Sequence, residues 1–116
     1  MYRTCLAGSP PSAPRNVRVE WKTETTVSLL WNPPRYGGPI LCYKVEKRQL
    51  SSEDDWHKVV DDCTTTNYLV TGLIVGTCYL LRVAARNYIG PGPFEQLPSP
   101  VTTSLQYGEL STSTYK

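Results

Sequence analysis

The stretch from residue 73 to 87, LIVGTCYLLRVAARN, constrains the fold most strongly, because its side chains alternate in character with a period of two. Tyr79, Leu81, Val83 and Ala85 share one face, and the positions between them include two arginines. A two-residue period is typical of a β-strand with one buried face. The stretch therefore predicts a central strand whose apolar face packs into a core.

The start of this strand predicts a particular turn. Tyr79 follows Leu73 by six residues, and Gly72 and Gly76 mark turns on either side of that leucine. A tyrosine placed there can bury its ring and bond its hydroxyl group to upstream backbone, which is the tyrosine corner of Greek-key sandwiches. Two residues later, where immunoglobulin domains carry a cysteine that bridges the sheets, this chain has Leu81. We expect packing alone to hold the sandwich.

Other short apolar segments alternate in the same way, between turns rich in proline and glycine. Besides the central strand, strands are expected within residues 13–21, 27–32, 40–50, 56–60, 66–73 and 97–104. Side chains expected to point inward from the first three are Val17, Val19, Val27, Leu29, Trp31, Leu41, Tyr43 and Val45. The loops are expected at 32–39, 51–55, 61–65 and 87–93.

Seven short strands without a helical period indicate an all-β fold, a seven-stranded immunoglobulin-like Greek-key β-sandwich. We expect strands one, two and five to form one sheet, and strands three, four, six and seven the other. The predicted structural core is Trp31, Tyr43, Val45, Leu73, Tyr79, Leu81 and Val83.

A chain of 116 residues suits a single core. We expect a flexible leader at 1–11, the domain at 12–104 and a flexible tail or linker at 105–116. The net charge of +2 comes from scattered residues, so no nucleic-acid partner is indicated. The sequence contains no apolar run of eighteen residues, so no membrane segment is expected.

The four cysteines, Cys5, Cys42, Cys63 and Cys78, contain no C-x-x-C pair, which disfavours zinc. Cys42 and Cys78 are expected near opposite ends of neighbouring antiparallel strands, beyond the ~7 Å that a disulfide spans. The spacing therefore favours free thiols and a reducing compartment.

No catalytic, cofactor or metal residues are predicted. His57 is the only histidine, and nearby serines and aspartates share its exposed hairpin region rather than surrounding a nucleophile. The acidic groups at 53–55 and 61–62 lack the ligand spacing of a calcium loop. We interpret both groups as solvated turns.

Two regions are candidate partner-binding surfaces. The outward face of strands three and six carries Lys44, Glu46, Arg48, Arg82 and Arg86, which suggests either an acidic partner or, as we favour, cross-strand charge pairs. Loops 32–39 and 87–93 should lie at the same pole. Their aromatic side chains either contact a partner or, as we favour, are turn residues tucked against the end of the sandwich or a neighbouring domain. The candidate contact residues are Tyr36, Tyr88, Ile89, Arg82 and Arg86.

Several motifs together identify a family resemblance. APRNV, WNPP, GGPILCYKVEKR and RVAARN, with Gly90 and Gly92 after them, resemble a fibronectin type III domain over residues 12–103. WNPP followed by GGPI and YKVEKR is most similar to the copies in giant muscle proteins such as titin, twitchin and myosin-binding protein C. The loop at 87–93 has no RGD tripeptide, and the chain has no W-S-x-W-S motif. Val75 stands where the family often has proline.

The resemblance implies a non-catalytic structural and protein–protein interaction module of a larger, cytoskeletal or sarcomeric protein. It implies a cytoplasmic, monomeric domain whose partners are cytoskeletal proteins and neighbouring immunoglobulin-like or fibronectin type III domains. The alternative is a ligand-recognition segment of an extracellular adhesion or receptor ectodomain.

Overall fold

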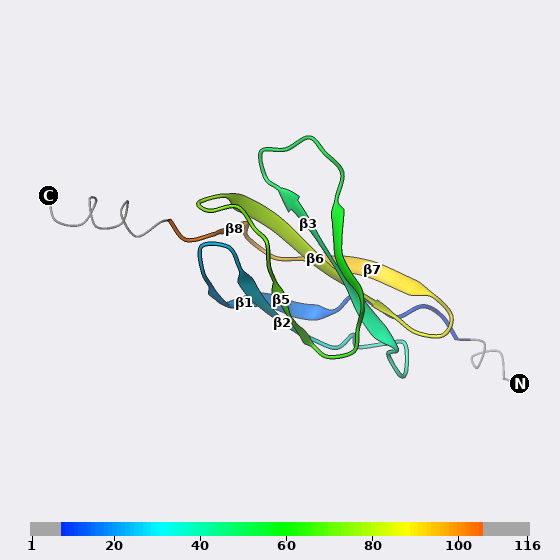
Figure 1. The fold of residues 1–116 in the computed structure, drawn as a ribbon. Helices are drawn as coiled ribbons and strands as arrows, with labels where there is room; N and C mark the ends of the chain where they lie inside the picture. Colours follow the sequence, from blue (N-terminus) through cyan, green and yellow to red (C-terminus); the bar gives the residue numbers. More distant parts are fainter. Residues whose placement is uncertain (1–7, 106–116) are drawn as a thin grey trace, which may run out of the picture.

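The computed structural model describes residues 8–105, and every regular element in that range is a β-strand (Figure 1). The strands are β1 (Arg15–Lys22), β2 (Val27–Asn32), β3 (Cys42–Gln49), β4 (His57–Cys63), β5 (Asn67–Val70), β6 (Cys78–Arg86), β7 (Pro91–Gln96) and β8 (Val101–Thr102). Residues 8–105 contain no helix that could cross a bilayer.

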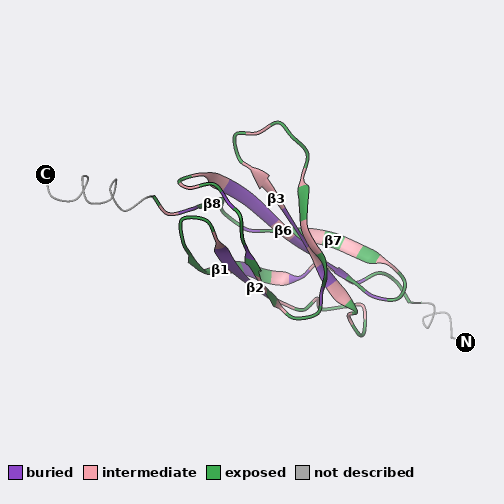
Figure 2. Ribbon diagram, in the orientation of Figure 1, coloured by how far each residue is buried: buried purple, intermediate pink, exposed green. Residues whose placement is uncertain are grey.

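The strands form two antiparallel sheets, in the orders β1-β2-β5 and β4-β3-β6-β7, with β8 also paired to β6. The predicted all-β sandwich and its division into sheets are confirmed. β6 is the longest strand and pairs with β3 from Cys42–Arg86 to Gln49–Tyr79. Figure 2 shows buried residues along most of its length.

The core lies between the sheets. Val27 and Leu29 of β2 face Val45, Leu81 and Val83 of β3 and β6, and all five are completely buried. The seven side chains predicted for the core are each at most 5% exposed: Trp31, Tyr43, Val45, Leu73, Tyr79, Leu81 and Val83. Alternating apolar side chains therefore close the sandwich.

Two aromatic rings close one end of this core. The rings of Trp31 and Tyr43 meet edge to face, with their centroids 5.4 Å apart. Burial raises the pKa of Tyr43, and the negative charge that Cys63 carries when ionised raises it further. Aromatic pairs in this arrangement add stability beyond the area they bury.

The predicted tyrosine corner is present. The backbone N–H of Ile74 donates to the Tyr79 hydroxyl oxygen at 2.8 Å. Thr103, which is 2% exposed, accepts from the Thr77 N–H at 2.9 Å and donates to the Ile74 carbonyl at 2.6 Å. With valine at position 75, polar bonds to the final strand region hold the turn.

The last part of the sandwich differs from the prediction. Residues 87–93 were expected to be a loop, but β7 begins at Pro91, while within 97–104 only Val101 and Thr102 form a strand. β7 and β8 both pair with β6, and the segment between them contains Pro98 and Pro100. The strand expected at the end of the domain is therefore divided into two pieces. Prolines are tolerated in β7 because it lies at a sheet edge, where alternate N–H groups need no partner.

Two further expectations were wrong. Leu41 was expected to face the core but is 56% exposed, because β3 begins only at the next residue, although the alternation of side chains in the sequence includes Leu41. Residues 61–63 were expected in a turn but continue β4, which pairs Cys63 with Tyr43. Asp61 and Asp62 are exposed on this edge strand.

Candidate functional site

Loops 32–39 and 87–90 meet at one pole of the sandwich, where Asn87 joins them. Asn87 is 2% exposed, and its Nδ2 donates to the carbonyl of Gly37 at 2.9 Å and to that of Ser9 at 2.8 Å. Its Oδ1 accepts from the backbone N–H groups two and three residues later. All polar atoms of this buried amide are therefore satisfied, and the predicted shared pole of the two loops is confirmed.

Three predicted contact residues are exposed at this pole. Tyr36 is 73% exposed, Tyr88 72% and Ile89 41%. A hollow of about 350 Å³ lies between the two loops and the chain at Gly8, with Tyr88 and Ile89 in its lining. Aromatic side chains are enriched in protein interfaces, which agrees with a role in partner binding. That role stays a prediction.

The N-terminal segment is packed against this pole. Pro11 is almost completely buried, and it lies so close to Gly37 that a Cβ atom there would be 2.5 Å from the Pro11 Cα. A Cβ on Gly92 would also overlap the Pro11 carbonyl group. Ser12 and Tyr36 exchange backbone and hydroxyl hydrogen bonds. The chain from Ser9 to Ser12 is therefore packed against the loop pole, and it overlaps the segment 1–11 that the sequence assigns to a leader.

The outward face of the larger sheet contains a charged and aromatic cluster around Arg82. Its Nε and Nη2 both donate to Glu46 Oε1, at 2.9 and 2.6 Å. Its guanidinium also lies between two rings, 4.1 Å from the centroid of Trp56 and 4.0 Å from that of Phe94. Lys44 Nζ lies 3.3 Å from the other oxygen of Glu46. The favoured cross-strand pairing is therefore present.

The cluster changes the ionisation of its carboxylate. Burial raises the pKa of Glu46, but hydrogen bonds from Arg82 and Lys44 outweigh burial and hold that pKa below its ordinary value. Arg82 is largely enclosed by its partners, with 26% of its side chain exposed. Arg86, at the end of the same strand, is exposed. The two arginines predicted to bind partners thus have different environments.

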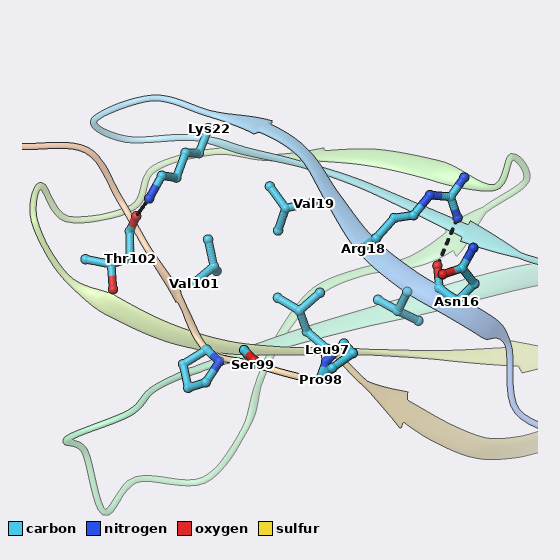
Figure 3. Close-up of a pocket in the computed structure, with 11 residues that line it drawn as sticks. Asn16, Arg18, Val19, Lys22, Leu97, Pro98, Ser99, Val101 and Thr102 are labelled. Carbon is cyan, nitrogen blue, oxygen red and sulfur yellow. Dashed lines mark hydrogen bonds between the residues drawn. The ribbon is translucent and has the colours of Figure 1, made fainter.

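A groove of about 600 Å³ separates β1 from the segment 97–102 (Figure 3). Val17, Val19, Leu97 and Val101 provide its apolar lining, and Lys22 spans one end by donating to the Thr102 carbonyl. β1 is an edge strand, and its pairing with β2 carries two register shifts. Such irregularities and an edge lysine discourage pairing with another strand, so this groove is a poor site for strand addition.

The described cysteines, Cys42, Cys63 and Cys78, are free thiols. Cys42 lies opposite Arg86 and Cys78 opposite Thr102, at the two ends of β6, as predicted. Cys5 lies outside the described residues. His57 is exposed, and residues 8–105 contain no group of three potential metal ligands.

Sequence reasoning did not identify Asn87, Phe94 or Pro11 as site residues. Asn87 follows directly after the central strand, and an Asn-x-x-Gly spacing is a signal for a side chain that caps a turn. Phe94 falls between the predicted loop at 87–93 and the predicted strand at 97–104. Its contact with Arg82 on the neighbouring strand could therefore not be predicted. Nothing near Pro11 in the sequence indicates its contact with Gly92.

Comparisons with known proteins agree with this architecture. The family described as Fibronectin type III domain matches residues 12–102. Rat neogenin is 34% identical over 91 residues, covering 76% of this chain and 7% of neogenin. Human cardiac-type myosin-binding protein C is 40% identical over 98 residues, covering 82% of this chain and 7% of that protein.

A solved structure is also similar. Domains A168–A170 of titin superpose with a TM-score of 0.77 at 32% identity, covering 84% of this chain and 33% of the titin fragment. The chain spans less than a tenth of either curated relative. Chicken receptor-type tyrosine-protein phosphatase S is 40% identical over 86 residues, covering 72% of this chain and 5% of that protein. The relatives thus include a muscle protein as well as neogenin and this receptor-type protein.

Proposed function

Because this chain belongs to the fibronectin type III family, whose domains are non-catalytic modules, we propose that it is a spacer and docking module of a larger cytoskeletal or sarcomeric protein. Its partners are cytoskeletal proteins and neighbouring immunoglobulin-like or fibronectin type III domains, and it acts in the cytoplasm. Similarity to myosin-binding protein C and to titin domains supports this setting.

The path of the chain is the observation that carries the proposal. The described chain begins beside the loop pole, where a Cβ on Gly8 would lie 3.5 Å from the Ile89 side chain. It leaves at the opposite end, where Leu105 lies next to Gly76 (Figure 1). A domain that the chain enters and leaves at opposite ends can be joined to others in line. Tension between the neighbours then loads the whole sandwich.

Mechanical pulling tests the spacer role. Stretched between handles at residues 12 and 102, the domain should unfold in one cooperative event that releases roughly 300 Å of chain at ~3.3–3.6 Å per residue. A gradual extension without a force peak would contradict the proposal.

The thiols support the cytoplasmic setting. Three cysteines are free in residues 8–105, and the sheet ends that carry Cys42 and Cys78 are too far apart to be bridged. Reducing compartments preserve such thiols. The parent protein is isolated without reductant, unfolded and titrated with a thiol reagent. Cys42, Cys63 and Cys78 should then all react as free sulfhydryl groups. An oxidised pair isolated from cells would contradict a cytoplasmic location.

Relatives of a different kind favour a second candidate function. Similarity to neogenin and to chicken receptor-type tyrosine-protein phosphatase S is compatible with a ligand-recognition segment of a receptor ectodomain. In that case the exposed pole with Tyr36 and Tyr88 would contact the ligand. Surface labelling of intact cells with a non-permeant reagent separates the alternatives: a labelled domain is extracellular, and an unlabelled one is cytoplasmic.

A further inference from the structure

We propose that the outward face of the larger sheet carries a docking notch for an acidic side chain of a protein partner. The inference rests on the proposed function as an interaction module and assigns one site and one chemistry to it. The docking notch is lined by residues of β3, β4, β6 and β7: Cys42, Lys44, Asp61, Ala84, Ala85, Arg86, Pro91, Gly92 and Phe94.

Strand register builds the docking notch. Lys44 and Phe94 lie on either side of Ala84 on the neighbouring strands, and Arg86 lies opposite Pro91. Ala84 is 4% exposed and forms a low floor because its side chain is a single methyl group. The resulting depression has a volume of about 350 Å³.

The walls have two chemical characters. Phe94 and Pro91 offer apolar surface to the aliphatic part of a side chain. Lys44, on the β3 side, and Arg86, two residues after Ala84 on β6, offer positive charge. Phe94 is held in place because its ring stacks on the Arg82 guanidinium at 4.0 Å. The charged and aromatic cluster around Arg82 therefore supports one wall of the docking notch.

The charges in and around the docking notch do not balance. Glu46 is shared by Arg82 and Lys44. Asp61, which also lines the docking notch, is paired with Lys58 at 3.0 Å, and the charge of Lys44 acts on it more weakly. These two carboxylates face four cations once Arg86 is included. Among the described residues, Arg86 has no carboxylate oxygen within 4.0 Å.

The unpaired charge selects the occupant. A carboxylate that enters between Lys44, whose side chain is 44% exposed, and Arg86 completes the charge pairing without displacing a bond of the folded domain. Such complementarity sets specificity and association rate. The volume accommodates one side chain with its stem, and two cations are too few for the phosphate contacts of a nucleic acid. A glutamate in an exposed segment of a partner protein fits best.

Peptide titration tests the assignment. The full chain, labelled with nitrogen-15, is titrated with blocked hexaglutamate at low salt. We expect the backbone amide signals of Ala84, Arg86 and Phe94 to shift, and the shifts to shrink as sodium chloride is raised to about 0.15 M, where charges are screened beyond about 8 Å. Blocked hexalysine should leave these signals unchanged.

Matched charge reversals provide the control. Arg86→Glu should weaken hexaglutamate binding at least tenfold, whereas Arg35→Glu, which makes the same change of net charge in loop 32–39, should weaken it less than threefold. Equal losses in the two variants, or shifts centred on another surface, would overturn the proposal. So would a response to phosphatidylserine vesicles in place of the peptide.

The Cys42 thiol provides a second measurement. Alkylation by anionic iodoacetate, relative to neutral iodoacetamide, should be faster at Cys42 than at Cys78, and Arg86→Glu should abolish the difference. Equal ratios in the parent chain would show that the docking notch has no positive field. Neither result bears on the spacer role, which the pulling experiment tests separately.

Discussion

Replacing Gly92 with alanine should release the N-terminal segment from the domain. The added Cβ would lie far closer to the Pro11 carbonyl oxygen than the 3.0 Å that real Cβ atoms essentially never pass. That oxygen belongs to backbone, so it cannot rotate away. Either β7 is displaced from β6, or Pro11 leaves its buried position and the hydrogen bond between Asn87 and Ser9 is lost.

The size of the effect follows from these alternatives. Insertion of a methyl group into a tightly packed site costs about 1 to 3 kcal/mol. For a domain of this size each kcal/mol lowers Tm by roughly 4 to 8 °C. We therefore expect Gly92→Ala to lower Tm by roughly 4 to 24 °C, measured by circular dichroism.

A truncation separates this clash from other effects of alanine. In a chain that lacks residues 1–11, Gly92→Ala should cost less than about 0.5 kcal/mol, since surface substitutions usually fall in that range. Gly72→Ala is the comparison: its φ is +71° and its Cβ would meet nothing within 4 Å. Its cost, about 1 to 2 kcal/mol for an L-residue in the left-handed region, should be the same in both chains. An equal cost of Gly92→Ala in both chains would refute the reasoning.

Two further variants test the corner and the cluster by urea unfolding. Tyr79→Phe leaves a backbone N–H without its partner and should cost about 1 to 3 kcal/mol, whereas Tyr68→Phe, which loses a hydroxyl on a half-buried strand, should cost less than half as much. Glu46→Gln should cost about 1.5 to 3 kcal/mol at pH 7. Because the folded pKa of Glu46 lies below its ordinary value of 4.5, the stabilisation is present above pH 4.5 and is lost as the pH falls further, through the folded pKa. A cost that stays the same at pH 3 would contradict the assigned pairing with Arg82.

The sheets could be predicted because side-chain alternation is a local signal. Along β6, every second residue is apolar and points inward, so the sequence itself shows which side of the sheet each residue faces. The same signal failed at Leu41, where the alternation continues in the sequence but the strand has not yet begun. It failed again at β7, whose prolines resemble a loop unless it is known that the strand lies at a sheet edge.

The candidate surfaces could be predicted only in part, because they depend on which residues meet across strands. In the sequence, Arg82 and Arg86 are both arginines at outward-facing positions of the same strand, and nothing distinguishes them. Only the register of β7 places Phe94 against Arg82, so that one arginine is held by a ring and a carboxylate while the other stays open. That register depends on an interrupted edge strand, which alternation alone does not locate.

The packing of Pro11 connects the fold with the proposed function. A spacer transmits force and orientation only if the chain becomes rigid at a defined residue, and here the segment from Ser9 is held by Asn87 and by the contact of Pro11 with Gly37 and Gly92. The direction in which the chain enters the domain is therefore fixed by the same loops that expose Tyr88. A partner or neighbouring domain that contacts this pole would meet a surface whose shape depends on the packed segment. Loss of that packing should alter both the unfolding force and the contact surface, although it leaves the core between the sheets unchanged.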